Sequence, residues 1–216
     1  MNIDFARQQM VQQQVRAWDV LDANILDVLT SVPREQFVPP GFEALAFADT
    51  EIPLQHGQSM MTPTVEGRLL QALALSKSDD VLEVGTGSGF LSACLARLAN
   101  SVTSIDIYAD FVKNAAANLE GAGIDNVDLL QMDAMQELPA RLFDAIAVTG
   151  SIQDFDPRFV MSLKPDGRLF VIVGNAPVMD ARIVHRFADN DWRTESLFET
   201  EVAPLVNAVG PPQFSF

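Results

Sequence analysis

The sequence predicts a Rossmann-like α/β fold with a seven-stranded, mostly parallel sheet, and three observations support this prediction. Between residues 64 and 174, five apolar segments with strand character alternate with helical segments, which is the pattern of a parallel sheet with right-handed crossovers. Residues 181–188 and 194–205 then alternate apolar and polar side chains around a polar turn, which predicts an antiparallel C-terminal hairpin at the sheet edge. A glycine-rich turn, 85–89, joins the first strand to its helix, where Rossmann-like folds bind their ligands.

The first 63 residues predict a helical and loop extension in front of this core. Apolar side chains in 4–18 recur at helical spacing among Gln and Arg residues, which predicts a helix lying on another surface. Asp22 is a suitable N-cap for a second helix, and Pro33 ends that helix. Residues 33–63 contain five prolines and are predicted to be loop-rich. We therefore expect an extension, 1–63, that covers the active face of a core, 64–216.

The core elements follow in a regular order. Residues 65–75 show helical spacing, and the apolar run 81–84 predicts a buried strand. The elements expected after these are a helix over 89–99, a strand over 101–107, a helix over 109–123, strands over 126–133 and 143–150, a helix around 156–163 and a strand over 167–174.

The charge balance argues against a nucleic-acid partner. Asp and Glu outnumber Lys and Arg by 29 to 14, so the formal net charge is −15. Proteins that bind phosphate backbones cluster their Lys and Arg residues, whereas the basic residues here are scattered along the chain. We therefore expect no binding to DNA or RNA.

The single cysteine and the chain's start indicate a cytoplasmic protein. Cys94 has no second cysteine with which to form a disulfide or to hold zinc, so no metal site is expected and a core position is favoured. The first residues lack the pattern of a signal peptide, and no apolar run approaches about 20 residues. The sequence therefore predicts a cytoplasmic location without a membrane partner.

The glycine turn and two acidic strand ends predict the cofactor. The turn has GxGxG spacing, and Phe90 stands where the third glycine of a dinucleotide-binding GxGxxG turn would fall. Asp106 ends the second strand, where a carboxylate can accept both ribose hydroxyls of an adenosine. Asp133 ends the third, beside the adenine or methionyl part of a ligand. These features favour S-adenosylmethionine over NAD and predict a cofactor site made of Glu83, Gly85, Thr86, Gly87, Ser88, Gly89, Asp106 and Asp133.

At this point the chain resembles the protein-L-isoaspartate O-methyltransferase family over most of its length. VLEVGTGSGF at 81–90 is similar to the family's VLEIGTGSGY, and VPREQFVP at 32–39 is similar to its VPRxxFVP. Further similarities lie at Met10-Val11 with Gln14-Val15, Ala48-Asp49 with Ile52-Pro53-Leu54, Gly57 to Pro63, Gly167-Arg168-Leu169 and Pro204-Leu205.

The resemblance implies a class I S-adenosylmethionine-dependent methyltransferase that esterifies the α-carboxyl of isoaspartyl residues. The chain departs from the family at two places: Met61 stands where the family has the serine of GQTIS, and 148–152 replaces a VTAAA-like run. A thioether cannot donate a hydrogen bond to a carboxylate. Ser59 and Thr62 are therefore the candidate catalytic residues that would orient the acceptor.

Several alternatives stay open at this stage. The acceptor can be an isoaspartyl protein or peptide, or another small molecule or peptide. The chain can also be a cofactor-binding protein without catalysis, and an NAD oxidoreductase is the least favoured reading. Among other candidates, His56 is a possible base but is favoured as a solvated loop residue, and His185 is favoured as structural. Residues 210–216 are interpreted as a flexible end or a clamp, and the oligomeric state is undetermined.

Overall fold

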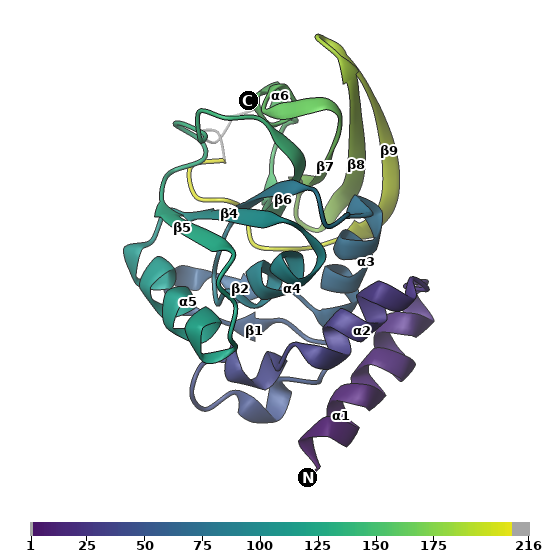
Figure 1. Ribbon diagram of the computed structural model, residues 1–216, viewed down its shortest axis with the longest axis vertical. Helices are drawn as coiled ribbons and strands as arrows, with labels where there is room; N and C mark the ends of the chain where they lie inside the picture. The colour runs from purple at the N-terminus through teal and green to yellow at the C-terminus, as the bar shows by residue number, and fades with distance from the viewer. Residues whose placement is uncertain (1, 209–216) are drawn as a thin grey trace, which may run out of the picture.

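A computed structural model describes residues 2–208 and contains a seven-stranded sheet in the order β5-β4-β3-β6-β7-β8-β9 (Figure 1). Strands β3 to β7 pair in parallel, and β8 and β9 continue the sheet in antiparallel fashion. The predicted fold and its C-terminal hairpin are therefore confirmed. The strands are β3 (Asp80–Val84), β4 (Ser101–Asp106), β5 (Val127–Gln131), β6 (Phe143–Ile152), β7 (Leu163–Asn175), β8 (Val178–Ala188) and β9 (Asp191–Thr200).

Two of the helices between the strands, α3 and α6, begin at a side-chain N-cap. The side chain of Thr62 accepts a hydrogen bond from the Val65 amide, and Pro63 occupies the first turn of α3. Asp156 caps α6, which is shorter than predicted because β7 already begins at Leu163. The four helices are α3 (Pro63–Leu73), α4 (Phe90–Leu98), α5 (Ala109–Gly121) and α6 (Pro157–Met161).

The N-terminal segment forms helices and turns, as predicted, but its first helix is not uniform. It consists of α1 (Ile3–Met10), a π-helical turn over 11–15 and a 3-10 turn over 16–18. Asp22 accepts from the Asn24 amide at the start of α2 (Ala23–Ser31). The loop-rich stretch contains a small antiparallel sheet of β1 (Ile52–Pro53) and β2 (Ser59–Met60), which is too short to produce a periodic sequence signal.

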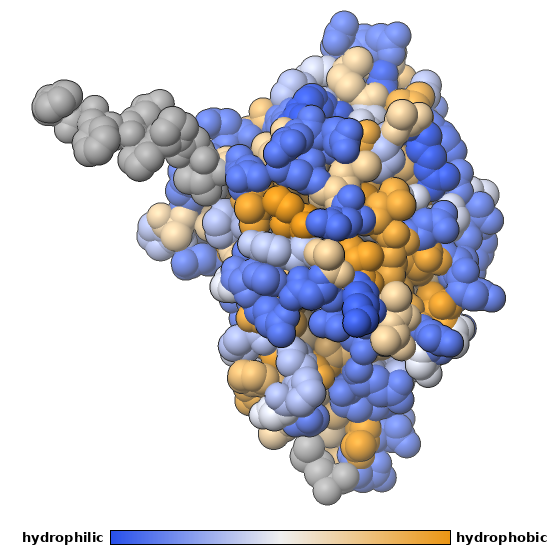
Figure 2. Space-filling model, turned by 90° about the vertical axis from the view of Figure 1, so that its left-hand side faces the viewer, coloured by the Kyte–Doolittle hydropathy of each residue, from blue (hydrophilic) through white to orange (hydrophobic). Residues whose placement is uncertain are grey.

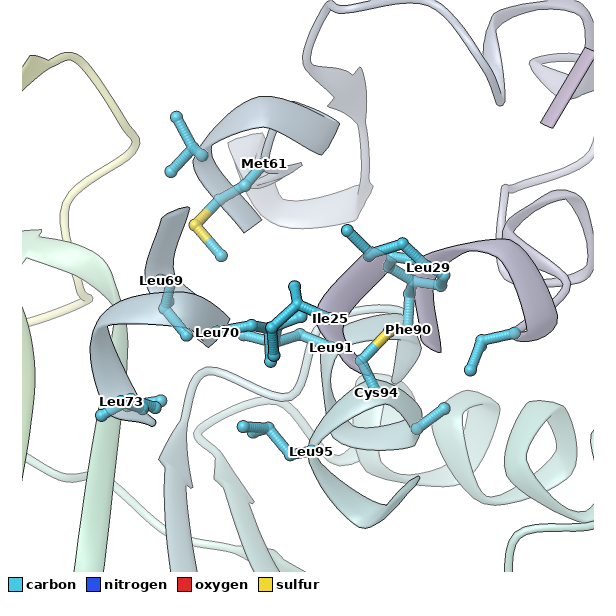
Figure 3. Close-up of a cluster of buried hydrophobic side chains, with 14 of the residues drawn as sticks. Ile25, Leu29, Met61, Leu69, Leu70, Leu73, Phe90, Leu91, Cys94 and Leu95 are labelled. Carbon is cyan, nitrogen blue, oxygen red and sulfur yellow. The ribbon is translucent and has the colours of Figure 1, made fainter. Parts of the chain in front are cut away.

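The N-terminal helices share a hydrophobic core with the sheet domain. Figure 3 shows apolar side chains from α2, α3 and α4 meeting in one cluster, among them Leu29, Leu70 and Cys94. Cys94 is fully buried, which confirms its predicted core position. Gly67 allows the close packing of α3 on the π turn, because a Cβ there would lie 2.7 Å from Cγ1 of Val15. The division of the chain at residue 63 stays a prediction.

The C-terminal segment differs from the prediction in where its last strand ends. Strand β9 ends at Thr200, whereas the sequence predicts a strand to 205. The chain instead passes the end of β6, where the Ser151 amide donates to the Ala203 carbonyl and the Leu205 amide donates to the Ser151 carbonyl. Gly150 makes this approach possible, because a Cβ there would lie 3.0 Å from the Leu205 nitrogen. Residues 210–216, which are interpreted above as a flexible end or clamp, lie outside the described residues.

The surface toward β5 and α5 is mixed in character. Figure 2 shows a band of apolar residues across the middle of this side, bordered by hydrophilic residues. Within residues 2–208, no helix has both the length and the apolarity needed to cross a bilayer.

Candidate active site

A pocket lies at the carboxyl ends of β3, β4 and β6, where open α/β sheets bind their ligands. We call it the main pocket. It contains about 720 Å³ of empty space, including space open to solvent. Its walls come from 51–61, the ends of β3 and β4 with Tyr108 and Phe111, 132–135, 149–150 and 202–206.

The glycine turn gives the pocket its floor. Gly85, Gly87 and Gly89 have φ values of 100°, 51° and 84°, in the region that favours glycine. A Cβ on Gly85 would lie 2.2 Å from Oγ1 of Thr149, which donates hydrogen bonds to the carbonyls of Val84 and Gly85 at 2.9 and 3.0 Å. The turn is therefore tightly held and leaves no room for side chains at its first glycine.

Asp106 lines the main pocket at the end of β4, as predicted. One carboxylate oxygen accepts from the Gly87 amide at 2.9 Å, and the other accepts from the Tyr108 amide at 3.0 Å. Burial raises the pKa of Asp106 above its ordinary value, although these amides act in the opposite direction. Each oxygen keeps a free lone pair, so the carboxylate can still accept ligand hydroxyls.

Asp133 also lines the main pocket and contacts the C-terminal segment. Its Oδ1 accepts from the Met135 amide at 2.9 Å, and its Oδ2 accepts from Nδ2 of Asn207 at 2.8 Å. The acidic ends of β4 and β5 thus lie on the same pocket, which the parallel arrangement of these strands explains.

Glu83 and Thr86 lie beneath the glycine turn, not in the main pocket. The carboxyl of Glu83 is fully buried, and its Oε2 accepts from the hydroxyls of Ser92 and Ser104. Thr86 Oγ1 lies 2.6 Å from the Ser104 hydroxyl. In the structure these two side chains support the turn, and their contribution to cofactor binding stays a prediction. The position of Glu83 follows from strand alternation: Val84 lines the pocket, whereas Glu83 points to the opposite face.

The environment of Glu83 keeps its carboxyl neutral. Burial raises the pKa of Glu83 to about 8, so that the group is mostly protonated at neutral pH. Its Oε1 is buried and has no hydrogen-bond partner among the described residues. Ser88 also lies off the main pocket, where its carbonyl accepts from Asn118 Nδ2 at 2.9 Å.

Ser59 and Thr62, the two candidate catalytic residues, have different positions. Ser59 lines the main pocket and donates to Oε2 of Glu51 at 2.8 Å. Thr62 caps α3 and lies 2.9 Å from the Thr64 hydroxyl, and it does not line the main pocket. The structure therefore brings Ser59, but not Thr62, to the main pocket, and Thr62 lines a neighbouring depression. Met61, which is 7% exposed, lies between Ser59 and Thr62 and also lines it.

A second depression, which we call the side groove, is continuous with the main pocket through shared residues such as Glu51, Ser59 and Val202. It extends along 49–65 and 198–204. Its charged wall residues are all acidic, namely Asp49, Glu51, Glu199 and Glu201. The groove is thus a negatively charged approach to the main pocket.

His56 supports the pocket wall rather than entering it. Its ring stacks on Tyr108 at a centroid distance of 3.8 Å, and its Nε2 lies 2.8 Å from Oδ2 of Asp110. These contacts tie the loop after β1 to the start of α5. His185 is half-buried on β8, away from the pocket.

Several pocket residues were not predicted from the sequence. Tyr108 follows Asp106 by two positions, so its place after a strand is a signal, whereas Thr149 lies within β6, in the 148–152 run that departs from the family. Residues 202–206 give no such signal, because a bridge to β6 brings them there. No group of three or more potential His, Cys, Asp or Glu metal ligands occurs in 2–208.

Comparisons with known proteins agree with this geometry. The family model described as protein-L-isoaspartate(D-aspartate) O-methyltransferase matches residues 6–210. Protein-L-isoaspartate O-methyltransferase 2 of Pelobacter propionicus is 33% identical over 97% of this chain and 94% of its own length. The protein of the same name, without a number, from Opitutus terrae is 38% identical over 79% of this chain and 73% of its own.

Solved structures show the same fold. A Plasmodium falciparum structure, described as this type of methyltransferase in complex with S-adenosyl-L-homocysteine, superposes with a TM-score of 0.80. It is 18% identical, and the match covers 92% of this chain and 97% of that one. A second structure, named protein-L-isoaspartate O-methyltransferase, has a TM-score of 0.81 at 20% identity and covers 94% of this chain and 67% of that one.

Proposed function

We propose that this chain, which belongs to the protein-L-isoaspartate(D-aspartate) O-methyltransferase family and is an S-adenosylmethionine-dependent methyltransferase, methylates a carboxylate of an isoaspartyl protein or peptide. The observation that carries the proposal is the continuity of two depressions. A main pocket beside the glycine turn opens into a side groove, and the two share Ser59 and Glu51. A small ligand and a larger acceptor can therefore meet at one junction.

The residues of the main pocket fit the cofactor. Gly85 has a positive φ and no space for a Cβ, so the backbone forms the cradle. Asp106 can accept the ribose hydroxyls, and Asp133 lies on the same wall for the adenine or methionyl part. Glu83 and Thr86 hold the turn from below. When bound, S-adenosylmethionine supplies an electrophilic methyl group on a sulfonium sulfur.

Methyl transfer to a carboxylate requires of the protein mainly that it align the two reactants. A carboxylate acceptor is ionised at neutral pH, so no side chain has to remove its proton. Ser59 is the hydroxyl at the junction that can orient an acceptor oxygen, and the apolar side chain of Met61 beside it excludes water. Alignment and desolvation of this kind account for large rate enhancements.

A second candidate acceptor is favoured by the charge of the side groove. Asp49, Glu51, Glu199 and Glu201 provide no cation to pair with an incoming carboxylate. They favour an acceptor whose carboxylate is flanked by cationic groups, which includes a small molecule as well as a peptide.

The sole cysteine, Cys94, is buried, which fits the cytoplasmic location expected from the sequence.

Labelled methyl transfer tests the proposal. The enzyme is given an isoaspartyl peptide, and product is scored as base-labile methanol; the same peptide with ordinary aspartate is the control. Flanking lysines are then exchanged for glutamates to test the side groove. Transfer to the isoaspartyl peptide alone supports the proposed function. Tight binding of S-adenosylhomocysteine without transfer to any carboxylate would favour a binding protein without catalysis.

A further inference from the structure

We propose that Glu66 receives the α-ammonium group of the bound cofactor and makes cofactor affinity depend on pH. This inference rests on the proposed use of S-adenosylmethionine and adds a residue outside the predicted site. It starts from a small cavity, which we call the back cavity, on the other side of the glycine turn. The back cavity and the main pocket share Ser59, Met61, Gly85, Gly87 and Thr149.

The carboxyl of Glu66 is the charged group in the wall of the back cavity. Glu66 lies in α3 and is 2% exposed. Its Oε2 accepts a hydrogen bond from Nη1 of Arg34, and no described residue donates to its Oε1. Arg34 does not line the cavity, so the buried pair presents its carboxylate to the ligand space. The second carboxylate oxygen of Glu66, at the wall of this cavity, is therefore an acceptor without a donor among the described residues.

The position of Glu66 is fixed by Arg34. The guanidinium of Arg34 donates to the Met61 carbonyl at 2.8 Å and stacks over the Phe90 ring with its Cζ 4.6 Å from the ring centroid. Arg34 is itself fully buried. Glu66 therefore cannot turn toward solvent, and a cation in the back cavity is the partner available to its second oxygen.

The methionyl arm of the cofactor fits the back cavity chemically. Its methionyl arm carries one ammonium and one carboxylate. The back cavity is bounded by Gly85, Gly87 and Ser88 of the turn and by Phe90 of α4, so the arm can reach it from the main pocket. An ammonium there forms charge-assisted hydrogen bonds with Glu66, and the arm's carboxylate is left to the backbone amides of the turn.

Protonation of Glu66 then competes with the ammonium. Burial raises the pKa of Glu66 to about 7, against the lowering effect of Arg34. The other titratable groups that interact with it are Glu83 and Cys94, and burial raises the pKa of both. A bound cation favours the ionised form of Glu66, so binding releases a proton near neutral pH and tightens as pH rises.

Two ligands test the inference on the unmodified enzyme. Calorimetry compares S-adenosylhomocysteine with an analogue whose α-amino group is replaced by hydrogen, from about pH 6 to about pH 8, in buffers of different ionisation enthalpy. S-adenosylhomocysteine should bind about tenfold more tightly than the analogue at the higher pH, with proton release. The difference should narrow toward the lower pH.

Two variants test whether the preference for the amino group depends on Glu66. Glu66→Gln should remove the preference for the amino group and the proton release, while Glu120→Gln, at an exposed position of α5, should keep both. Equal affinities of the two ligands, or a preference that survives Glu66→Gln, overturn this inference alone. If neither ligand binds, the proposed function fails as well. If Glu66→Gln does not fold, the comparison of ligands on the unmodified enzyme decides.

Discussion

The cofactor side and the acceptor side of the site are built in different ways. The cofactor side consists of a glycine turn and two acidic strand ends, all set by consecutive parallel strands. The acceptor side is assembled from segments far apart in the chain, 49–65 and 198–204. The first is fixed by short-range geometry, and the second depends on contacts such as the Ser151–Pro204 bridge. Changes on the first side should therefore impair cofactor binding, and changes on the second should alter the use of the acceptor.

The largest effect is expected from Gly85→Ala. The backbone there has a φ of 100°, and the new Cβ would lie 2.2 Å from Thr149 Oγ1. Strain and the clash together should weaken S-adenosylhomocysteine binding about a hundredfold or more, as measured by calorimetry. Gly41→Ala is the matched control, because Gly41 has a φ of 92° and no atom within 4 Å of its Cβ position. Similar affinities in the two variants would contradict the role of the turn.

A smaller loss is expected from Asp106→Asn. The amide retains the shape of the side chain but replaces one acceptor oxygen, so binding of S-adenosylhomocysteine should weaken about tenfold to a hundredfold. Asp128→Asn, at an exposed position on β5, is the control. If Asp106→Asn binds with unchanged affinity, the ribose does not depend on this carboxylate.

On the acceptor side, Ser59→Ala and Thr62→Ala should separate function from stability. Ser59 lies at the junction of pocket and groove, so its loss should lower kcat/KM for the acceptor several-fold, by about 1 kcal/mol, with cofactor affinity unchanged. Thr62 caps α3, so its loss should lower the free energy of unfolding by about 1 kcal/mol and leave kcat/KM nearly unchanged. Steady-state kinetics and urea unfolding distinguish the two. The reverse pattern would make Thr62 the orienting hydroxyl.

The smallest effect concerns pH and Glu83. Its folded-state pKa, raised by burial from 4.5 to about 8, means that the folded protein binds more protons than the unfolded chain between these values. The stability that the neutral carboxyl contributes is therefore lost as pH rises toward about 8. Glu83→Gln should remove this dependence and gain about 1 kcal/mol relative to the unmodified protein between about pH 7 and about pH 8 in urea unfolding. Parallel pH profiles would show that the carboxyl is already ionised at the lower pH.

These differences explain what could be predicted from the sequence. The sheet order, the glycine turn and the pocket positions of Asp106 and Asp133 follow from local patterns and from the rule that parallel strands end at one edge. The sequence did not indicate that Glu83 faces away from the main pocket, because a motif gives the position of a residue and not the face of the strand. The Arg34–Glu66 pair joins residues 32 positions apart, and nothing local in either segment indicates it.

The C-terminal segment was the least predictable part of the site. Its approach to the pocket depends on the absence of a side chain at Gly150, on the backbone hydrogen bonds with Ser151 and on a hydrogen bond from Asn207 to Asp133, 74 residues away. Hydrophobic periodicity in the sequence does not reveal contacts of this kind, because residues 201–208 form neither a strand nor a helix.

That attachment has an evolutionary consequence. Residues 201–204 form part of the groove wall and belong to no strand of the sheet, and they are attached to it at Gly150 and Ser151. Glu201 and Pro204 line the side groove but not the main pocket, so substitutions at these two positions can change the groove while the glycine turn and the cofactor pocket stay intact. A lineage can thus acquire a new acceptor preference by altering a few positions near its C-terminus, without having to evolve a new enzyme.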